Sequence, residues 1–105
     1  MKTYKVVITD KAKSQMSLYL RYLKHDLKNP QAAKAVRDDF KETIKQLRNV
    51  AGSLKYCENP NLAKKKLKKI NFQRHEYVML YLIEDNTATV VHIYHMLQDY
   101  ENKMI

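Results

Sequence analysis

The sequence predicts an α+β fold in the order β-α-α-β-β-β, with a helical hairpin packed on a mostly antiparallel sheet. The first observation is a pair of runs, Glu76–Ile83 and Thr87–Tyr94, rich in the β-branched, aromatic and long apolar residues typical of strands. The polar Glu84-Asp85-Asn86 between them is typical of a tight turn. The second observation is two consecutive segments with apolar residues at helical spacing. The third is a short strand-like run on either side of those segments, Tyr4–Ile8 and Lys68–Phe72.

Length and composition indicate one small domain spanning residues 1–105. The chain has 20 Lys and Arg against 11 Asp and Glu, a formal charge of +9. This excess favours acidic partners; the alternative is that it only keeps the protein soluble. Cys57 is the only cysteine, so an intramolecular disulfide is impossible and a reducing compartment is indicated. The longest stretch without Asp, Glu, Lys or Arg, Asn86–Gln98, is too short and too polar to span a bilayer. We therefore expect a cytoplasmic protein without a membrane partner, a cofactor or a metal site.

Both predicted helices have clear start signals. Thr9 or Asp10 is suited to cap the first helix, and Asn29 the second, where Pro30 fits the first helical position. Gly52 is suited to a C-cap or turn after the second helix. A short connection predicts an antiparallel helical hairpin. The apolar stripes are Ala12, Met16, Tyr19, Leu20, Leu23 and Leu27 on the first helix, and Ala33, Val36, Phe40, Ile44 and Leu47 on the second.

Two groups of cations stand out. The second helix carries Lys34, Arg37, Lys41, Lys45 and Arg48 on one face, which is either an ordinary solvated face, diluted by nearby Asp38, Asp39 and Glu42, or a surface for an acidic partner. A lysine-rich run then precedes the Lys68–Phe72 strand. It either prevents edge-to-edge association of strands or binds phosphates. The predicted nucleic-acid-binding residues are Lys65, Lys66, Lys68 and Lys69.

The first strand of the hairpin is apolar on both faces. One face carries Tyr77, Met79, Tyr81 and Ile83, and the other carries Val78, Leu80 and Leu82. A strand of this kind is covered on both sides, and the two helices can cover only one. The cover of the second face is expected from the C-terminal tail or from another chain, so we predict Val78, Leu80 and Leu82 as partner-binding residues.

The chain resembles the RelE/ParE family, the toxins of type II toxin–antitoxin modules. The resemblance covers nearly the whole chain. It is carried by the opening Tyr-Lys-Val-Val-Ile-Thr-Asp-Lys-Ala, the Asn-Pro-Gln-Ala-Ala at the helical turn, Leu-Lys-Lys-Ile-Asn-Phe, His-Glu-Tyr-Val-Met-Leu-Tyr and the closing Ile-Tyr-His-Met-Leu-Gln-Asp-Tyr-Glu-Asn. It implies a growth-inhibiting toxin neutralised by a small acidic antitoxin that wraps around it.

Members of the family divide by mechanism, and the resemblance leaves the division open here. RelE-like toxins cut mRNA in the ribosome without a metal, using basic, His and Tyr side chains; the matching catalytic candidates are His95 and Tyr100, with Arg74 and His75 nearby. ParE-like toxins inhibit DNA gyrase. Val78 stands where ribosome-dependent members often carry Arg, and Leu97 stands at another usually basic position. A non-toxic module that only pairs with its antitoxin is the third alternative.

The remaining polar aromatics of the last strand, His92 and Tyr94, are expected to share a face with Val90. We interpret them as packing and hydrogen-bonding residues at the end of the sheet.

Overall fold

The computed structural model of the protein describes residues 2–96. Its elements, in chain order, are β1 (Lys5–Ile8), α1 (Asp10–Arg21), a π-helical turn (Tyr22–Asp26), α2 (Pro30–Val50), a 3₁₀ turn (Ala51–Ser53), α3 (Pro60–Lys64), β2 (Lys68–Asn71), β3 (Tyr77–Glu84) and β4 (Thr87–His95). The predicted α+β fold class is confirmed, with the short helix α3 as an additional element.

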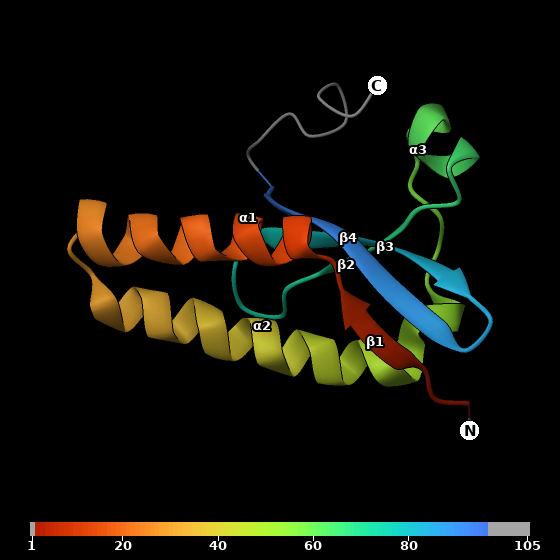
Figure 1. Cartoon of the computed structure of the whole chain (residues 1–105), viewed down its shortest axis with the longest axis horizontal. Helices are drawn as coiled ribbons and strands as arrows, with labels where there is room; N and C mark the ends of the chain where they lie inside the picture. Colours follow the sequence, from red (N-terminus) through yellow and green to blue (C-terminus); the bar gives the residue numbers. More distant parts are fainter. Residues whose placement is uncertain (1, 97–105) are drawn as a thin grey trace.

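The four strands form one sheet in the order β1-β4-β3-β2. β2, β3 and β4 are antiparallel neighbours, whereas β1 lies parallel to β4, with Lys5 opposite Thr87. The predicted tight turn joins β3 to β4, and Asp85 adopts a left-handed conformation there, with φ of 55°. The first and last described strands therefore lie side by side (Figure 1).

The two long helices lie antiparallel along one side of the sheet (Figure 1). The Thr9 hydroxyl accepts a hydrogen bond from the Ala12 amide at 3.2 Å, and the Asn29 side chain accepts one from the Ala32 amide at 3.0 Å, so both predicted caps are present. The first helix continues as a π-helical turn. In a π-helical turn each amide bonds to the carbonyl five residues earlier, so the side chains no longer follow the 3.6-residue period of an α-helix. Leu27 is therefore 53% exposed and does not extend the apolar stripe.

The main core lies between the helices and the sheet. β3 contributes Met79 and Tyr81, which are fully buried, and α2 contributes Leu47. The Tyr81 hydroxyl donates to the Ala51 carbonyl at 2.8 Å, and burial raises the pKa of Tyr81 so that this donor stays protonated. The hairpin's first apolar face is thus covered by the helices, as predicted.

A segment between the second helix and the second strand covers the opposite face. We call residues 54–67 the α3 segment; its Cys57, Leu62 and Leu67 pack against Val78 and Leu80. The expectation that this cover would come from the C-terminal tail or another chain is wrong for Val78 and Leu80, which are 1% and 0% exposed beneath these contacts.

Local capping explains how the α3 segment folds. The α3 segment contains Asn59-Pro60, which starts the helix α3. The Asn59 side chain accepts hydrogen bonds from the amides of Asn61 at 2.9 Å and Leu62 at 3.4 Å, and Pro60 takes the first helical position. The Cys57 amide then donates to the Leu67 carbonyl at 2.9 Å and closes the segment.

Gly52 lies in a turn after the second helix, which is one of the two roles expected for it. It lies in the 3₁₀ turn after α2 and has no positive φ, so it is not a left-handed cap. A Cβ at this position would collide with the hydroxyl of Tyr4, which lies against the glycine backbone. Gly52 therefore makes room for the chain entering β1.

Candidate functional site

The predicted catalytic residues within residues 2–96 lie in different surroundings. His95 ends β4 on the helix side of the sheet, where its ring meets the Tyr77 ring edge-on with centroids 5.0 Å apart. Its amide donates to the Tyr19 hydroxyl at 3.3 Å. Tyr100 lies outside the described residues. The geometry thus places His95 in the aromatic packing around Tyr19 and Tyr77.

Arg74 and His75 belong to the loop between β2 and β3, and a buried carboxylate on α2 organises that loop. Asp39 is 1% exposed and accepts hydrogen bonds from the amides of Gln73 at 3.1 Å and Arg74 at 2.9 Å. It also lies 2.7 Å from His75 Nδ1 and accepts a hydrogen bond from the Thr43 hydroxyl at 3.5 Å. Burial alone would raise the pKa of Asp39, but these hydrogen bonds outweigh it and hold the pKa below its usual value. The His75 ring is therefore held by Asp39. Arg74 lines a surface hollow beside α2.

A β-bulge changes which side chains share a face on β4. Tyr81 pairs with Val90, but its neighbour Leu80 pairs with His92, so one extra residue of β4 is inserted. Val90 consequently packs in the helix-side core, while His92 lies opposite Leu80 on the other face. The prediction that Val90 and His92 share a face is wrong for this reason.

The bulge creates a compact polar pair beside the α3 segment. The rings of His92 and Tyr94 stack with centroids 5.5 Å apart and an interplanar angle of 20°. His92 Nδ1 and the Tyr94 hydroxyl are 3.3 Å apart. Burial lowers the pKa of His92, and the positive charges of Lys11 and Lys65 lower it further. This arrangement favours a neutral imidazole within reach of cations.

The predicted nucleic-acid-binding lysines divide between the faces of the sheet. Lys69 pairs with Leu80 and so shares the face of His92, whereas Lys68 pairs with Tyr81 on the helix side. Lys68 Nζ lies 4.9 Å from the centroid of the Tyr56 ring and donates to the Gly52 carbonyl at 3.3 Å. Lys66 is exposed in a left-handed turn, and Lys65 lies near His92. They do not form a single patch.

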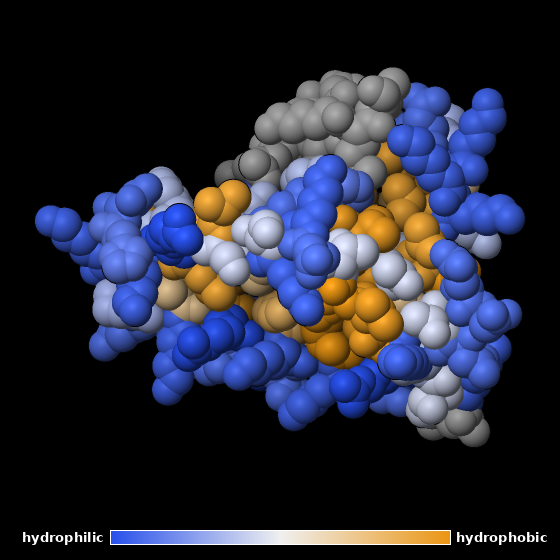
Figure 2. All heavy atoms as spheres, in the orientation of Figure 1, coloured by the Kyte–Doolittle hydropathy of each residue, from blue (hydrophilic) through white to orange (hydrophobic). Residues whose placement is uncertain are grey.

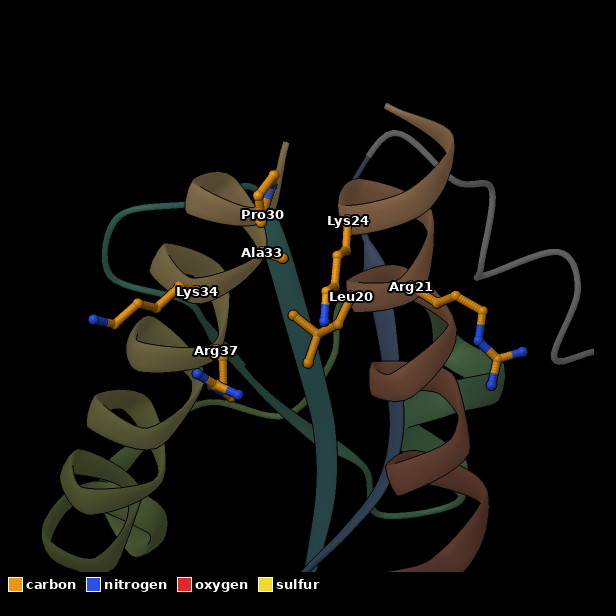
Figure 3. A pocket seen from close by; sticks show the side chains of 7 residues that line it. All are labelled: Leu20, Arg21, Lys24, Pro30, Ala33, Lys34 and Arg37. Carbon is orange, nitrogen blue, oxygen red and sulfur yellow. The ribbon is translucent and has the colours of Figure 1, made fainter. Parts of the chain in front are cut away.

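The cationic stripe of α2 lines three surface hollows. Lys34 and Arg37 line one between the two long helices (Figure 3). Lys41 and Lys45 line the second together with Asp38, Glu42 and Arg74. The third, of about 780 Å³, lies beside β1 and is lined by Thr3, Tyr4, Lys5, Val6, Lys45, Arg48 and Asn49.

A patch of apolar side chains lies over β1 and β4, framed by hydrophilic residues (Figure 2). Val7 of β1 is 39% exposed, and Val91 of β4 and Leu82 of β3 are half-buried. β1 is an edge strand, because its neighbour in the sheet is β4 alone among the described strands. The patch therefore continues to an edge that offers backbone hydrogen-bonding groups.

Comparison with known families decides the identity of the fold. Residues 6–100 match the family model described as "ParE toxin of type II toxin-antitoxin system, parDE". The chain belongs to the ParE toxin family. No protein with a curated functional description matches it in sequence.

A solved structure shares the ParE-family fold. It is described as "Chromosomal ParDE TA system from P. aeruginosa", and the two chains superpose with a TM-score of 0.71 at 17% sequence identity. The match covers 89% of this chain and 96% of the other. At this identity the likeness concerns the fold, and it agrees with the helical hairpin and sheet described above.

Two features of this ParE-family chain were not predicted from its sequence. The charge pattern places Asp39 only among the acids that dilute a positive face, although an acid between the apolar positions Val36 and Phe40 of an amphipathic helix is a signal for a buried carboxylate. His92 packs and hydrogen-bonds as predicted, but its face of the sheet is not predicted because the bulge is not visible in the sequence pattern.

No group of three or more His, Cys, Asp and Glu side chains within residues 2–96 is placed to hold a metal ion. The helices in that part of the chain are also not long and apolar enough for any of them to cross a membrane.

Proposed function

We propose that this ParE-family chain is a cytoplasmic toxin that inhibits growth by acting on DNA gyrase and is neutralised by a small acidic antitoxin. The family match over residues 6–100 supports the toxin–antitoxin assignment. The choice of gyrase over ribosome-bound mRNA rests on the geometry of the predicted catalytic residues.

The observation that carries this choice is the dispersal of those residues. His95 packs on Tyr77, and His75 is bound to Asp39. Val78, where ribosome-dependent members often have Arg, is 1% exposed in the apolar core under the α3 segment. In-line cleavage of RNA needs a base, an acid and phosphate-holding cations within a few ångströms of one phosphorus. Within residues 2–96, His95, His75 and Arg74 lie in separate contacts that do not supply that arrangement.

The β1 edge is the proposed docking site for the antitoxin. Lys5 and Thr9 donate their amides toward β4, at 2.8 Å to Asn86 and 3.0 Å to Val90, so the alternation of a strand turns the amide of Val6 outward. An extended segment can add there as a further strand. Lys5, Lys45 and Arg48 line the adjoining hollow and complement an acidic segment.

The predicted partner-binding residues are assigned accordingly. Leu82, half-buried, belongs with Val91 and Val7 to the apolar patch that the antitoxin is proposed to cover. Val78 and Leu80 contribute indirectly, because they hold the α3 segment in place.

The primary test is purified full-length protein in a gyrase supercoiling assay, together with induced expression in cells. We expect arrested growth, inhibited supercoiling and intact mRNA, and co-expression of the antitoxin encoded beside the gene should restore growth. Codon-positioned mRNA cleavage with normal supercoiling would contradict gyrase as the target. Unaffected growth despite tight antitoxin binding would assign the protein as a non-toxic pairing module.

The docking site is tested by charge reversal. Lys5→Glu with Arg48→Glu should weaken antitoxin binding, measured by calorimetry. The matched control Lys64→Glu with Lys66→Glu changes the net charge equally at exposed positions of the lysine-rich run. Equal weakening in both variants would contradict a site at β1.

One observation favours a second candidate function, RNA cleavage at a different place from the one predicted. His92, Tyr94, Lys65 and Lys69 lie on one face of the sheet, and the neutral form of His92 is favoured. A neutral imidazole can accept the 2′-hydroxyl proton, a tyrosine can donate one, and lysines can hold the phosphate. Under this alternative, His92→Ala would abolish mRNA cleavage on translating ribosomes, whereas His75→Ala would leave the cleavage pattern intact.

A further inference from the structure

The hollow between the two long helices is surrounded by cations and lies apart from the β1 edge. It has a volume of about 230 Å³. α1 and the π-helical turn contribute Arg21 and Lys24, and α2 contributes Lys34 and Arg37. The remaining lining is Leu20, Pro30 and Ala33, so the described side chains around the hollow include no acid.

These cations are available for a ligand. All four are exposed, and within residues 2–96 none of them lies within 4.0 Å of an Asp or Glu oxygen. The middle of the α2 stripe differs, because Asp38 and Glu42 line the hollow there and Lys45 pairs with Glu42 at 3.5 Å. Positive charge without internal compensation is therefore concentrated at this end of the helical hairpin.

The directions of the side chains define what fits. Lys24 extends into the space between the helices beside Leu20, and Arg37 lies on the opposite wall (Figure 3). Lys34 and Arg21 extend outward on opposite sides of the hollow (Figure 3). An anion held here meets donors from two walls, which suits the tetrahedral oxygens of phosphate better than the two oxygens of a flat carboxylate. The outward pair is placed to meet neighbouring phosphates of a chain.

We propose that this hollow is a binding site for the phosphate backbone of nucleic acid. Lys24 and Arg37 hold one phosphate group over the apolar floor formed by Leu20 and Ala33, and Lys34 and Arg21 contact the phosphates on either side. The site contacts backbone only, so it binds without sequence preference and its affinity falls steeply with salt. This inference does not depend on gyrase as the target or on the antitoxin site at β1.

The test measures binding of purified full-length protein to a fluorescein-labelled DNA duplex by anisotropy across a salt series. Removing two phosphate contacts with Lys24→Gln and Arg37→Gln should reduce the slope of log affinity against log salt by about 1.8. The fall in affinity between about 50 and 200 mM salt should then be roughly 12-fold smaller than in the unmodified protein. Lys24→Arg with Arg37→Lys keeps both charges and should keep the slope.

The control Lys55→Gln with Lys64→Gln removes the same charge from exposed positions of the α3 segment and should change the slope little. A slope change as large in this control, or full binding by Lys24→Gln/Arg37→Gln, would overturn the site.

Competition separates the ligand classes. Unlabelled duplex should displace the labelled one, whereas equal displacement by polyglutamate of matched charge would assign the hollow to acidic protein segments. Displacement by free nucleotide at the same phosphate concentration would assign it to a small ligand, and both of these results overturn the proposal.

Discussion

Met79 and Leu80 are neighbours on β3 and both are fully buried, but they lie under different covers. Met79 faces the core beneath α1 and α2, which are long helices with regular apolar stripes. Leu80 faces the α3 segment, where the regular structure is the short helix Pro60–Lys64. The comparison teaches that equal burial can rest on covers of different strength, because a long helix fixes its side chains through many backbone hydrogen bonds and a short irregular segment does not.

The largest expected effect contrasts these two neighbours directly. Met79→Ala should lower the free energy of unfolding by about 2–5 kcal/mol, because the rigid helices cannot close the cavity. Leu80→Ala should cost less within the same range of roughly 2–5 kcal/mol, because the α3 segment can settle into the space. Urea unfolding measures both, and an equal or larger cost for Leu80→Ala would contradict the difference in rigidity.

The contacts of Asp39 in α2 with the β2–β3 loop sharpen the comparison on the helix side of the sheet. Asp39→Asn should destabilise the protein by about 1–3 kcal/mol at neutral pH, since a buried acceptor for two amides and His75 loses its charge. The native pKa of Asp39 lies below its usual 3.8, so the stabilisation is complete above that value and is lost as pH falls through the lowered native pKa. Thermal unfolding of both proteins between neutral and acid pH should show the difference shrinking, and a constant difference would contradict the role of the charge.

A substitution in the 3₁₀ turn Ala51–Ser53, which leads from α2 to the α3 segment, should have a smaller effect on the free energy of unfolding. Gly52→Ala places a methyl group against the Tyr4 hydroxyl, which lies at the far end of a flexible side chain and can move. We expect the free energy of unfolding to fall by about 1 kcal/mol, the typical loss for a point substitution. In the Tyr4→Ala background the same substitution should be neutral in a double-mutant cycle, and additive losses would show that the contact is not the cause.

The smallest effect concerns the face under the α3 segment. Burial, Lys11 and Lys65, in that order, lower the pKa of His92, so its contribution to stability is complete above the usual 6.5 and is lost as pH falls through the lowered value. Lys11→Gln should raise the pKa of His92 measured by NMR titration of its ring protons, and Lys65→Gln should raise it less. No change with either substitution would place His92 away from these lysines.

The regular part of this fold could be predicted from the sequence. The hairpin strands, predicted at Glu76–Ile83 and Thr87–Tyr94, are observed at Tyr77–Glu84 and Thr87–His95. Composition and turn chemistry act locally there, and the same is true of the caps at Thr9 and Asn29. Local signals sufficed because neighbouring residues determine these features.

The candidate site could be predicted only in part. The inserted residue on β4 turns His92 away from Val90, and its position depends on pairing with β3 instead of on the β4 sequence itself. Asp39 acquires its role from Gln73, Arg74 and His75, which lie more than thirty positions along the chain. Such roles arise from tertiary contacts that no local pattern contains.

The parallel pairing of β1 with β4 has a consequence for how the toxin is made. Lys5 of β1 pairs with Thr87 of β4, and the side chain of Gln15 in α1 accepts a hydrogen bond from the Ile93 amide at 2.8 Å. The start of the chain can therefore make these contacts only after β4 has been synthesised. Contacts so distant in sequence form late in folding. A nascent chain that stops before β4 lacks the strand with which β1 pairs, so the proposed antitoxin site at the β1 edge is not yet formed in it.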